Sequence, residues 1–514
     1  MRTLFICLFV VGSVFALNGK GLNNDVVALL GVPYAKPPVD TLRFRESVPV
    51  EFDKEKSYKV WRNRCIDFRV EEGLSEDCLY LNMFVKKENF LKGKKTKLLL
   101  HITNEEVSET KISSLVTADL SVAVASARDG VLGSLNDAPY SVSDVKAILN
   151  FLYDTDEFLV GDVTIWAENT LAETVASALP QITVKASIQI NGNGVTRTRY
   201  REDYGKRAMH DLRTLSACDL PAEEQSLDCL RTKSLNDLLD HAHELWVSYR
   251  PLGSPFRSPR TFIPENSVPT IYGIHKHIGK EYLYEPRDFT EQFDYNIFKE
   301  FLANLIPDSL FKNAPLVRRM ILHQYVYSTG DKKDTYHLFQ QMEKILFDKD
   351  YHIPTEMLIR HLREYKNKVW LMEYGVDTPL KSCVQDGTPD TLDAFCKRLL
   401  QFFTRFAEKD APTEYSCDPK NPNFPQMDTS KRPYYIILPE SGIADWRYNY
   451  YLPEYELWMH MVPMLDQLDL VGFRPPQFEE AKQTEPLQVE DDVQGWHQEE
   501  AKKGEKLHQE KVEL

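Results

Sequence analysis

A chain of 514 residues is longer than a typical domain, and its 42% hydrophobic and 11% aromatic residues can build a large packed core. The formal net charge of −15, without clustered Lys and Arg, argues against nucleic acid as a partner. After the N-terminus, no apolar run reaches the length that spans a membrane.

The first sixteen residues have the pattern of a secretory signal peptide. One basic residue, Arg2, precedes a short apolar stretch, and Val14-Phe15-Ala16 stands before the expected cleavage point. We therefore expect residues 1–16 to be removed and the mature chain to enter an oxidising lumen. Loss of Cys7 leaves seven cysteines, so we expect disulfides with one thiol left over.

Two motifs follow in chain order. The first contains Gly31-Val32-Pro33-Tyr34-Ala35, and the second is Ser75-Glu76-Asp77-Cys78-Leu79-Tyr80-Leu81-Asn82. Together they resemble the N-terminal signature of type-B carboxylesterases and cholinesterases, a family that includes neuroligins and the C-terminal domain of thyroglobulin. The resemblance covers roughly residues 20–470. It implies one α/β-hydrolase domain over residues 17–476, with a mostly parallel central sheet covered by helices on both faces.

The same resemblance implies two disulfides. Cys65 with Cys78, and Cys218 with Cys229, match cysteine pairs that close short loops in the family. The sequence leaves the pairing of the remaining cysteines open: one pair among them is expected, and the third thiol stays free or bridges to another chain. These remaining cysteines are Cys383, Cys396 and Cys417.

Residues 163–174 form the frame in which the family places its nucleophile. An expected strand, Val163–Trp166, gives way to a stretch of helical composition, and the family's turn between them reads Gly-x-Ser-x-Gly. Here the turn reads Ala167-Glu168-Asn169-Thr170-Leu171, so Asn169 takes the serine position. A carboxamide cannot serve as the acyl acceptor. Asparagine tolerates a left-handed backbone, so the turn can survive without its chemistry. Leu171, which replaces the second glycine, indicates that the turn has also relaxed.

The segment that supplies oxyanion amides in the family is also altered. After the apolar run 97–100, the chain continues His101-Ile102-Thr103-Asn104, where the family has His-Gly-Gly-Gly. The histidine persists, but each glycine is replaced, and Glu105 and Glu106 follow. Carboxylates at this place would repel a developing negative charge.

The orienting acid and the catalytic base of the family are replaced as well. The run Tyr272-Gly273-Ile274-His275-Lys276-His277-Ile278-Gly279 places Ile278 where the acid belongs. No histidine occurs between Gly375 and Pro389, where the base belongs. The resemblance thus implies that no catalytic residue remains. The vestigial positions are Asn169, Ile278 and His101.

A metal site is a further alternative that the histidines raise. His275 and His277 would share one strand face, but no third ligand follows at a fixed spacing. Packed or surface histidines are the favoured interpretation, so we expect neither a metal nor a cofactor.

The last 38 residues differ in composition from the rest. Residues 477–514 hold eleven acidic and five basic residues without a sustained helical stripe, which predicts an acidic, disordered tail. The tail ends Lys511-Val512-Glu513-Leu514, which resembles a Lys-Asp-Glu-Leu retrieval signal. We expect a retrieval receptor to hold the protein in the endoplasmic reticulum lumen, with secretion as the alternative.

The favoured hypothesis is a catalytically inactive carboxylesterase-like protein of this lumen that binds a protein client or assists its folding. One alternative is a divergent carboxylesterase or lipase that hydrolyses carboxylic esters through an unrecognised site. The other is a secreted, neuroligin-like adhesion or signalling protein. The expected partners are a protein of unknown identity and the retrieval receptor, without nucleic acid or a membrane span. A homodimer packed through Leu399–Phe406 and Leu452–Leu465 is one arrangement that the family allows.

Overall fold

The computed structural model describes residues 19–22, 25–66, 71–135, 138–196, 204–249, 268–276, 293–375, 380–387, 390–413, 424–427 and 434–468. The chain divides into two compact units, Met1–Asp466 and Gln467–Leu514. Four features of the sequence lie outside the described residues: the expected signal peptide 1–16, Ile278, Cys417, and the tail 477–514 with Lys511, Val512, Glu513 and Leu514.

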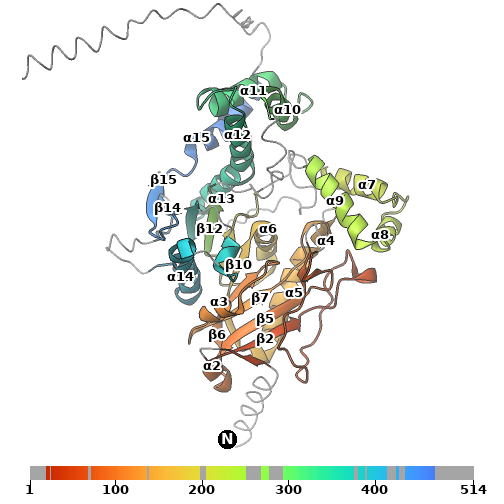
Figure 1. The fold of residues 1–514 in the computed structure, drawn as a ribbon, viewed down its shortest axis with the longest axis vertical. Helices are drawn as coiled ribbons and strands as arrows, with labels where there is room; N and C mark the ends of the chain where they lie inside the picture. The colour runs from red at the N-terminus through yellow and green to blue at the C-terminus, as the bar shows by residue number, and fades with distance from the viewer. Residues whose placement is uncertain are drawn as a thin grey trace, which may run out of the picture. The chain divides into compact units, whose positions relative to one another are not determined.

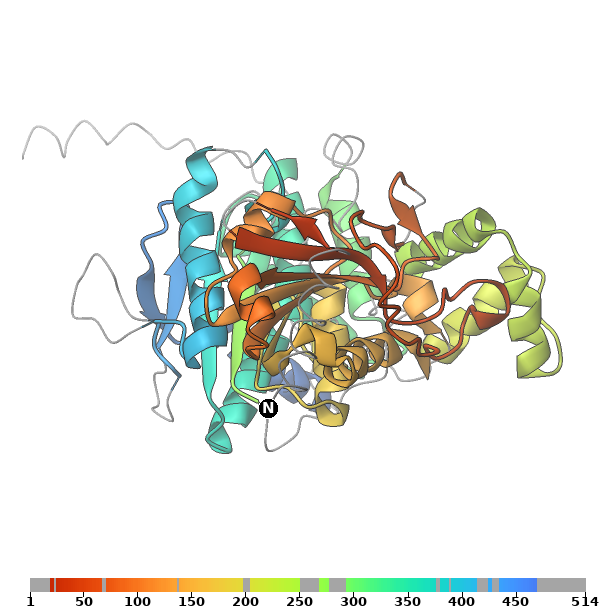
Figure 2. The same ribbon diagram turned by 90° about the horizontal axis from the view of Figure 1, so that it is seen from below.

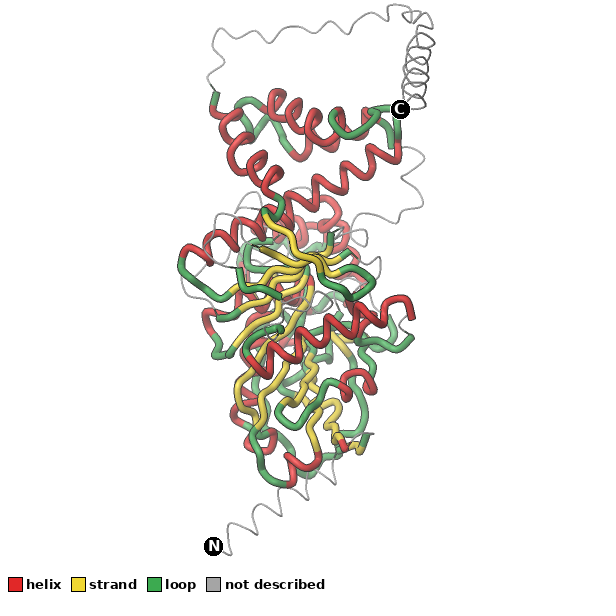
Figure 3. The backbone as a smooth tube through the Cα atoms, turned by 90° about the vertical axis from the view of Figure 1, so that its left-hand side faces the viewer, coloured by secondary structure: helices red, strands yellow, loops and turns green. Residues whose placement is uncertain are grey.

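One large sheet organises the first unit. In the described part of the chain it has 11 strands in the order β1-β2-β5-β7-β6-β10-β11-β12-β13-β14-β15. In this sheet order, the strands from β7 to β14 run parallel, and antiparallel strands flank them on both sides, which confirms the predicted mostly parallel sheet. Figure 3 shows the strands side by side in yellow. The bounds are β1 (Lys20–Gly21), β2 (Val26–Pro33), β5 (Tyr80–Lys86), β6 (Thr96–Ile102), β7 (Leu120–Ala125), β10 (Val160–Glu168), β11 (Ala186–Ile190), β12 (Thr270–His275), β13 (Val369–Tyr374), β14 (Tyr434–Leu438) and β15 (Asp445–Tyr448).

Two short ribbons lie outside this sheet among the described residues. One pairs β3 (Arg64–Cys65) with β4 (Leu74–Ser75), and the other pairs β8 (Ser134–Leu135) with β9 (Ala138–Pro139).

The central strands are nearly continuous apolar runs because both of their faces are covered. Each residue of β7, with the sequence LSVAVA, is buried, and so is each residue of β13, with the sequence VWLMEY. Such runs are typical of parallel strands that have helices on both sides.

Helices pack on both faces of the sheet, as predicted. One face carries α5 (Tyr140–Asp154) and α6 (Asn169–Ala178), whose apolar residues form a core with β6, β7 and β10. The other face carries α3 (Glu109–Ser114) and α14 (Asp393–Lys409), which form a second core around Trp166 (Figure 2, with α14 in cyan).

The apolar side chains of α14 belong to this second core. Leu399, Phe402, Phe403 and Phe406 are at most 1% exposed. The homodimer that would use Leu399–Phe406 stays a prediction, and these four side chains are not exposed for it. The chain uses them to cover its own sheet.

The remaining helices form further groups. Helices α7, α8 and α9 lie together, and their apolar residues share one core (Figure 1). Helices α10, α11 and α12 share another core with apolar residues of the last helical segment, residues 452–466. Among the described residues, no helix combines the length and apolar character that crossing a membrane requires. The bounds are α2 (Lys87–Leu91), α4 (Gly130–Gly133), α7 (Tyr204–Leu215), α8 (Glu223–Arg231), α9 (Leu235–Tyr249), α10 (Tyr295–Leu305), α11 (Ala314–Leu322), α12 (Thr335–Phe347), α13 (Ile353–Glu364), α15 (Leu452–Glu456) and α16 (Val462–Gln467).

Three disulfides link described residues. Cys65–Cys78 and Cys218–Cys229 are the pairs that the family resemblance implies. The third, Cys383–Cys396, joins two of the three cysteines whose pairing the sequence left open.

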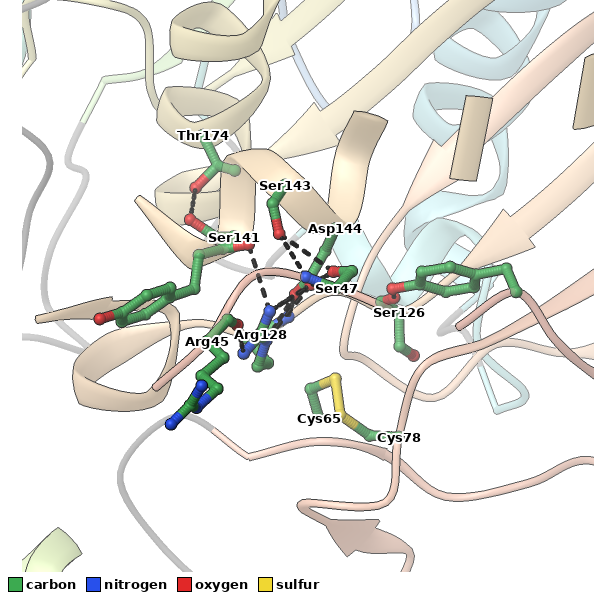
Figure 4. A network of polar contacts seen from close by, with 12 residues as sticks. Arg45, Ser47, Cys65, Cys78, Ser126, Arg128, Ser141, Ser143, Asp144 and Thr174 are labelled. Atoms are coloured by element: carbon green, nitrogen blue, oxygen red, sulfur yellow. Dashed lines mark hydrogen bonds and ion pairs between the residues drawn. A yellow bond between two sulfur atoms is a disulfide. The ribbon is translucent and has the colours of Figure 1, made fainter. Parts of the chain in front are cut away.

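A buried ion pair fixes the chain after β7. The guanidinium of Arg128 donates to Asp144 on α5, with Nη2 and Oδ1 separated by 2.7 Å, and both side chains are at most 3% exposed (Figure 4). Arg128 Nη1 also donates to the carbonyl of Arg45 at 2.8 Å. Since a buried charge is stable only when it is paired, these contacts hold the backbone on either side of Arg128 in one position. The next residue is Asp129, whose carboxylate lies at the first turn of α6.

Candidate functional site

The turn between β10 and α6 keeps the geometry that a nucleophile elbow requires. β10 ends at Glu168 and α6 begins at Asn169, whose φ of 54° is left-handed. Gly192 lies against this turn, since a Cβ at Gly192 would stand 2.2 Å from the carbonyl oxygen of Asn169. The position at the centre of the elbow therefore presents a carboxamide in place of a hydroxyl.

Two backbone amides of the expected oxyanion segment already have acceptors within the protein. The amide of Thr103 donates to the carbonyl of Ala125 at 2.9 Å. The amide of Glu105 donates to Oγ1 of Thr103 at 3.0 Å. Asn104 anchors the same segment, because its Nδ2 donates to the carbonyl of Ala127 at 2.8 Å. Two amides of this segment are thus engaged, and neither is directed at a substrate oxygen.

A carboxylate stands at the first turn of α6. The hydroxyl of Thr170 donates to Oδ2 of Asp129, and the amide of Gly130 donates to Oδ1 of the same carboxylate at 2.7 Å. Thr170 follows the elbow residue directly, so Asp129 places negative charge where the family stabilises an oxyanion. This contact was not predicted from the sequence. Its one signal there was the acidic residue in the run Ala127-Arg128-Asp129-Gly130, which resembles a family segment.

His101 packs into the core below the elbow. Its ring stacks on that of Trp166, with centroids 3.7 Å apart and an interplanar angle of 5°, and the side chain is 2% exposed. Burial lowers the pKa of His101 to about 3, so the imidazole is neutral at physiological pH. Nε2 lies 3.9 Å from Oε1 of Glu168. The histidine that the sequence kept from the family segment therefore acts as an aromatic neighbour of Trp166.

The carboxyl ends of β11, β12 and β13 contribute further polar groups. Asn191 directly follows β11, and its Oδ1 accepts from the amide of His275 at 2.8 Å. The ring of His275 lies against that of Tyr374, with centroids 5.1 Å apart. Ile278 and His277 lie outside the described residues.

The segment after β13 is held by a disulfide. The short helix η8 (Leu380–Cys383) follows β13, and Cys383 bonds to Cys396 on α14. Next to it, the carbonyl of Val384 accepts from the amide of Ser108 at 2.6 Å. The family carries its catalytic histidine after this strand, and this chain has a covalent tether there.

The described part of this region shows no candidate metal centre. Within the described ranges, no three His, Cys, Asp or Glu side chains gather as a potential metal site. A cavity beside Cys65–Cys78 has room for solvent of about 10 Å³ and is lined by Arg43, Glu76 and Arg128 among others. This volume suits about one water molecule.

Comparison with known proteins agrees with the fold. The model of the carboxylesterase family matches residues 10–389. Carboxylesterase 5A from Homo sapiens is 24% identical over 389 residues, which are 68% of this chain and 66% of that protein. Carboxylesterase 1E from Mus musculus is 22% identical over 437 residues, 73% of this chain and 75% of that protein. Acetylcholinesterase from Danio rerio is 25% identical over 264 residues, 44% of this chain and 42% of that protein. The chain spans just under two thirds of the length of carboxylesterase 5A.

Proposed function

The chain belongs to the carboxylesterase family, and from this premise we propose that it is a non-catalytic member that acts by binding another protein. The observation that carries the proposal is the left-handed Asn169 at the elbow, which keeps the turn and lacks a nucleophile.

The groups around the elbow support this proposal. An ester hydrolase of this architecture needs a nucleophile, a base, an orienting acid and oxyanion donors. Here Thr103 and Glu105 use their amides internally, and Asp129 brings a carboxylate to Thr170. Loss of a triad member leaves a rate of roughly 10³ to 10⁴ over water, and loss of one oxyanion donor removes a further 10² or more. The remaining turnover is expected near background.

The binding role and the compartment are parts of the same proposal. Non-catalytic relatives such as neuroligins act through protein contacts, and the family resemblance extends that role to this chain. Three disulfides among the described residues support an oxidising compartment. Lys511–Leu514 favours the endoplasmic reticulum lumen, with secretion as the alternative.

The decisive experiment asks whether the elbow carries out chemistry. Wild type, Asn169→Ser and Asn169→Ala are each treated with a fluorophosphonate probe and assayed on short-chain nitrophenyl esters. We expect all three to stay at background, because a serine hydroxyl alone has no base to accept its proton. Stoichiometric labelling of the wild type would establish the divergent esterase in place of the binding protein. Labelling of Asn169→Ser alone would show that a base and an oxyanion site persist.

A second experiment tests the binding role. Mild cross-linking in the secretory pathway, followed by purification under reducing and non-reducing conditions, is expected to recover one partner in near-stoichiometric amount. Asn169→Ala should recover the same partner, since the proposal assigns no chemistry to the elbow. Recovery of the retrieval receptor alone would contradict a client-binding role.

A further inference from the structure

A buried carboxylate joins several helical segments beside β13. Asp348 opens the segment η7 (Asp348–His352) directly after α12, and it is 1% exposed. Tyr325 lies on η6 (His323–Tyr327), and Trp458 lies on η10 (Leu457–Met461). Each of these three segments is π-helical, a distortion of the α-helix that is frequent at functional sites.

Hydrogen bonds connect the three segments through one oxygen. Oδ2 of Asp348 accepts from the hydroxyl of Tyr325 at 2.8 Å and from Nζ of Lys344 at 2.7 Å. Nζ of Lys344 also donates to Oε1 of Glu454 at 3.0 Å, and Nε1 of Trp458 donates to the hydroxyl of Tyr325 at 2.9 Å. Glu454 and Trp458 belong to residues 452–466, so the cluster links this last helical segment to η6, which continues α11, and to α12 (Figure 1).

The second carboxylate oxygen of Asp348 does not take part in these hydrogen bonds. Oδ1 is buried and has no hydrogen-bond partner among the described residues. An ionised carboxylate with one unsolvated oxygen is costly in a protein interior, whereas a neutral carboxyl group loses much less on burial. The geometry therefore favours protonation of Asp348 more strongly when the segments are closed around it than when water reaches the carboxyl group.

Charged and titratable groups approach Asp348 from each neighbouring element. Tyr325 comes from η6, Lys344 from α12, and Glu454 from α15. Tyr451, just before α15, is also within electrostatic reach. The segment of Asp348 itself carries Lys349, Asp350 and His352, of which Lys349 and Asp350 pair with each other.

We propose that this cluster is an acid-tightened joint, in which protonation of Asp348 holds residues 452–466 more firmly on α11 and α12 than its ionised form does. When Asp348 gains a proton, the unpartnered oxygen no longer bears charge, and the hydroxyl of Tyr325 keeps an acceptor. Lys344 keeps its second partner, Glu454, so the cation is not left alone.

The direction of titration agrees with the geometry. Desolvation raises the pKa of Asp348 to about 6, against the opposing attraction of Lys344. Opening the segment hydrates the carboxyl group and returns its pKa towards about 3.9. Since the closed form binds the proton more tightly, closure strengthens as the pH falls through 6. Between pH 7 and pH 5 the opening equilibrium is expected to fall about tenfold.

Hydrogen–deuterium exchange of residues 452–466, corrected for intrinsic rates, measures this opening directly. We expect the full-length wild type to show about tenfold greater protection at pH 5 than at pH 7. Asp348→Asn, which keeps the shape and an acceptor for Tyr325, should be protected at pH 7 as the wild type is at pH 5, without pH dependence. The matched control is Asp308→Asn, which removes an exposed carboxylate paired with Arg318 and should behave as the wild type.

A second variant keeps the proposal testable if Asp348→Asn folds poorly. Lys344→Gln removes the cation that lowers the pKa of Asp348, so the midpoint of the protection change should move to higher pH. Equal pH dependence in the wild type and Asp348→Asn would overturn the proposal. Weaker protection of the wild type at pH 5 than at pH 7, or an unmoved midpoint in Lys344→Gln, would do the same.

Discussion

The carbonyl oxygen of Asn169 and the α-carbon of Gly192 are in such close contact that a Cβ at Gly192 would stand 2.2 Å from that oxygen. Gly192, which lies just after β11, therefore packs against the elbow with no space for a side chain. Its left-handed backbone is preserved although no hydroxyl is present.

Gly192→Ala should destabilise the fold because the added methyl group meets backbone, which cannot rotate away. We expect a loss of about 1–3 kcal/mol in the free energy of unfolding, measured by urea denaturation. Gly21→Ala is the control, since nothing lies within 4 Å of a Cβ at that position. Equal stability of the two variants would contradict this steric requirement for glycine at position 192.

His101 should make the fold sensitive to acid. Its folded-state pKa of about 3 lies below the unfolded value of about 6.5, so the unfolded chain binds the proton more tightly. The stability that the neutral ring contributes is therefore present above pH 6.5 and is lost as the pH falls towards 3. By pH 5 the loss is about 2 kcal/mol.

His101→Phe tests this expectation, because it keeps an aromatic ring beside Trp166 and removes the titration. The difference in unfolding free energy between pH 7 and pH 5 should shrink by about 2 kcal/mol in this variant. An unchanged difference would show that His101 is protonated in the fold or hydrated. The fold raises the pKa of Asp348, so Asp348 makes the fold more stable as the pH falls, opposite to His101. The unfolding free energies of the wild type and His101→Phe are therefore compared at the same pH.

The disulfide Cys383–Cys396 should stabilise the segment after β13. It closes a loop with a sequence separation of 13 residues, so replacing both cysteines by serine should cost about 3 kcal/mol in the chain-entropy account. Cys218→Ser/Cys229→Ser, with a separation of 11, serves as a loop-matched comparison. Urea denaturation measures both. Non-reduced peptide mapping that joins Cys383 or Cys396 to Cys417 would contradict the pairing.

The end strand β15 should be protected from self-association by its own side chains. The amide of Trp446 donates to Oδ1 of Asp445 at 2.8 Å, and its carbonyl accepts from Nη1 of Arg447 at 3.2 Å. Asp445 and Arg447 also form an ion pair at 2.6 Å. Exposed strand edges readily pair with other chains unless side chains block them.

The double variant Asp445→Ala/Arg447→Ala is therefore expected to self-associate at lower concentration than the wild type. Sedimentation velocity over a concentration series measures this change. Glu88→Ala/Lys92→Ala, which removes an exposed ion pair at α2 and likewise leaves the net charge unchanged, is the control. Equal self-association of the double variant and this control would show that Asp445 and Arg447 do not protect the edge of β15.

Much of the fold follows from short-range information in the sequence. The N-terminal motifs and the frame around Trp166 resemble those of the carboxylesterase family, and this resemblance implied a mostly parallel sheet with helices on both faces. Such motifs are short runs of residues, so they can be recognised without the tertiary structure. Asn169 at the elbow was also readable, since asparagine is among the few non-glycine residues that adopt a left-handed backbone readily.

Other features were decided by tertiary structure alone. The contact of Asp129 with Thr170, the stacking of His101 on Trp166, and the joint of Asp348 with Glu454 each join residues from different elements. Periodicity reports which face of an element is apolar, but it does not report which distant polar atom will meet another. Hydrogen bonds and pKa shifts act over a few ångströms, so they are set only when packing of the sheet and helices fixes the distances.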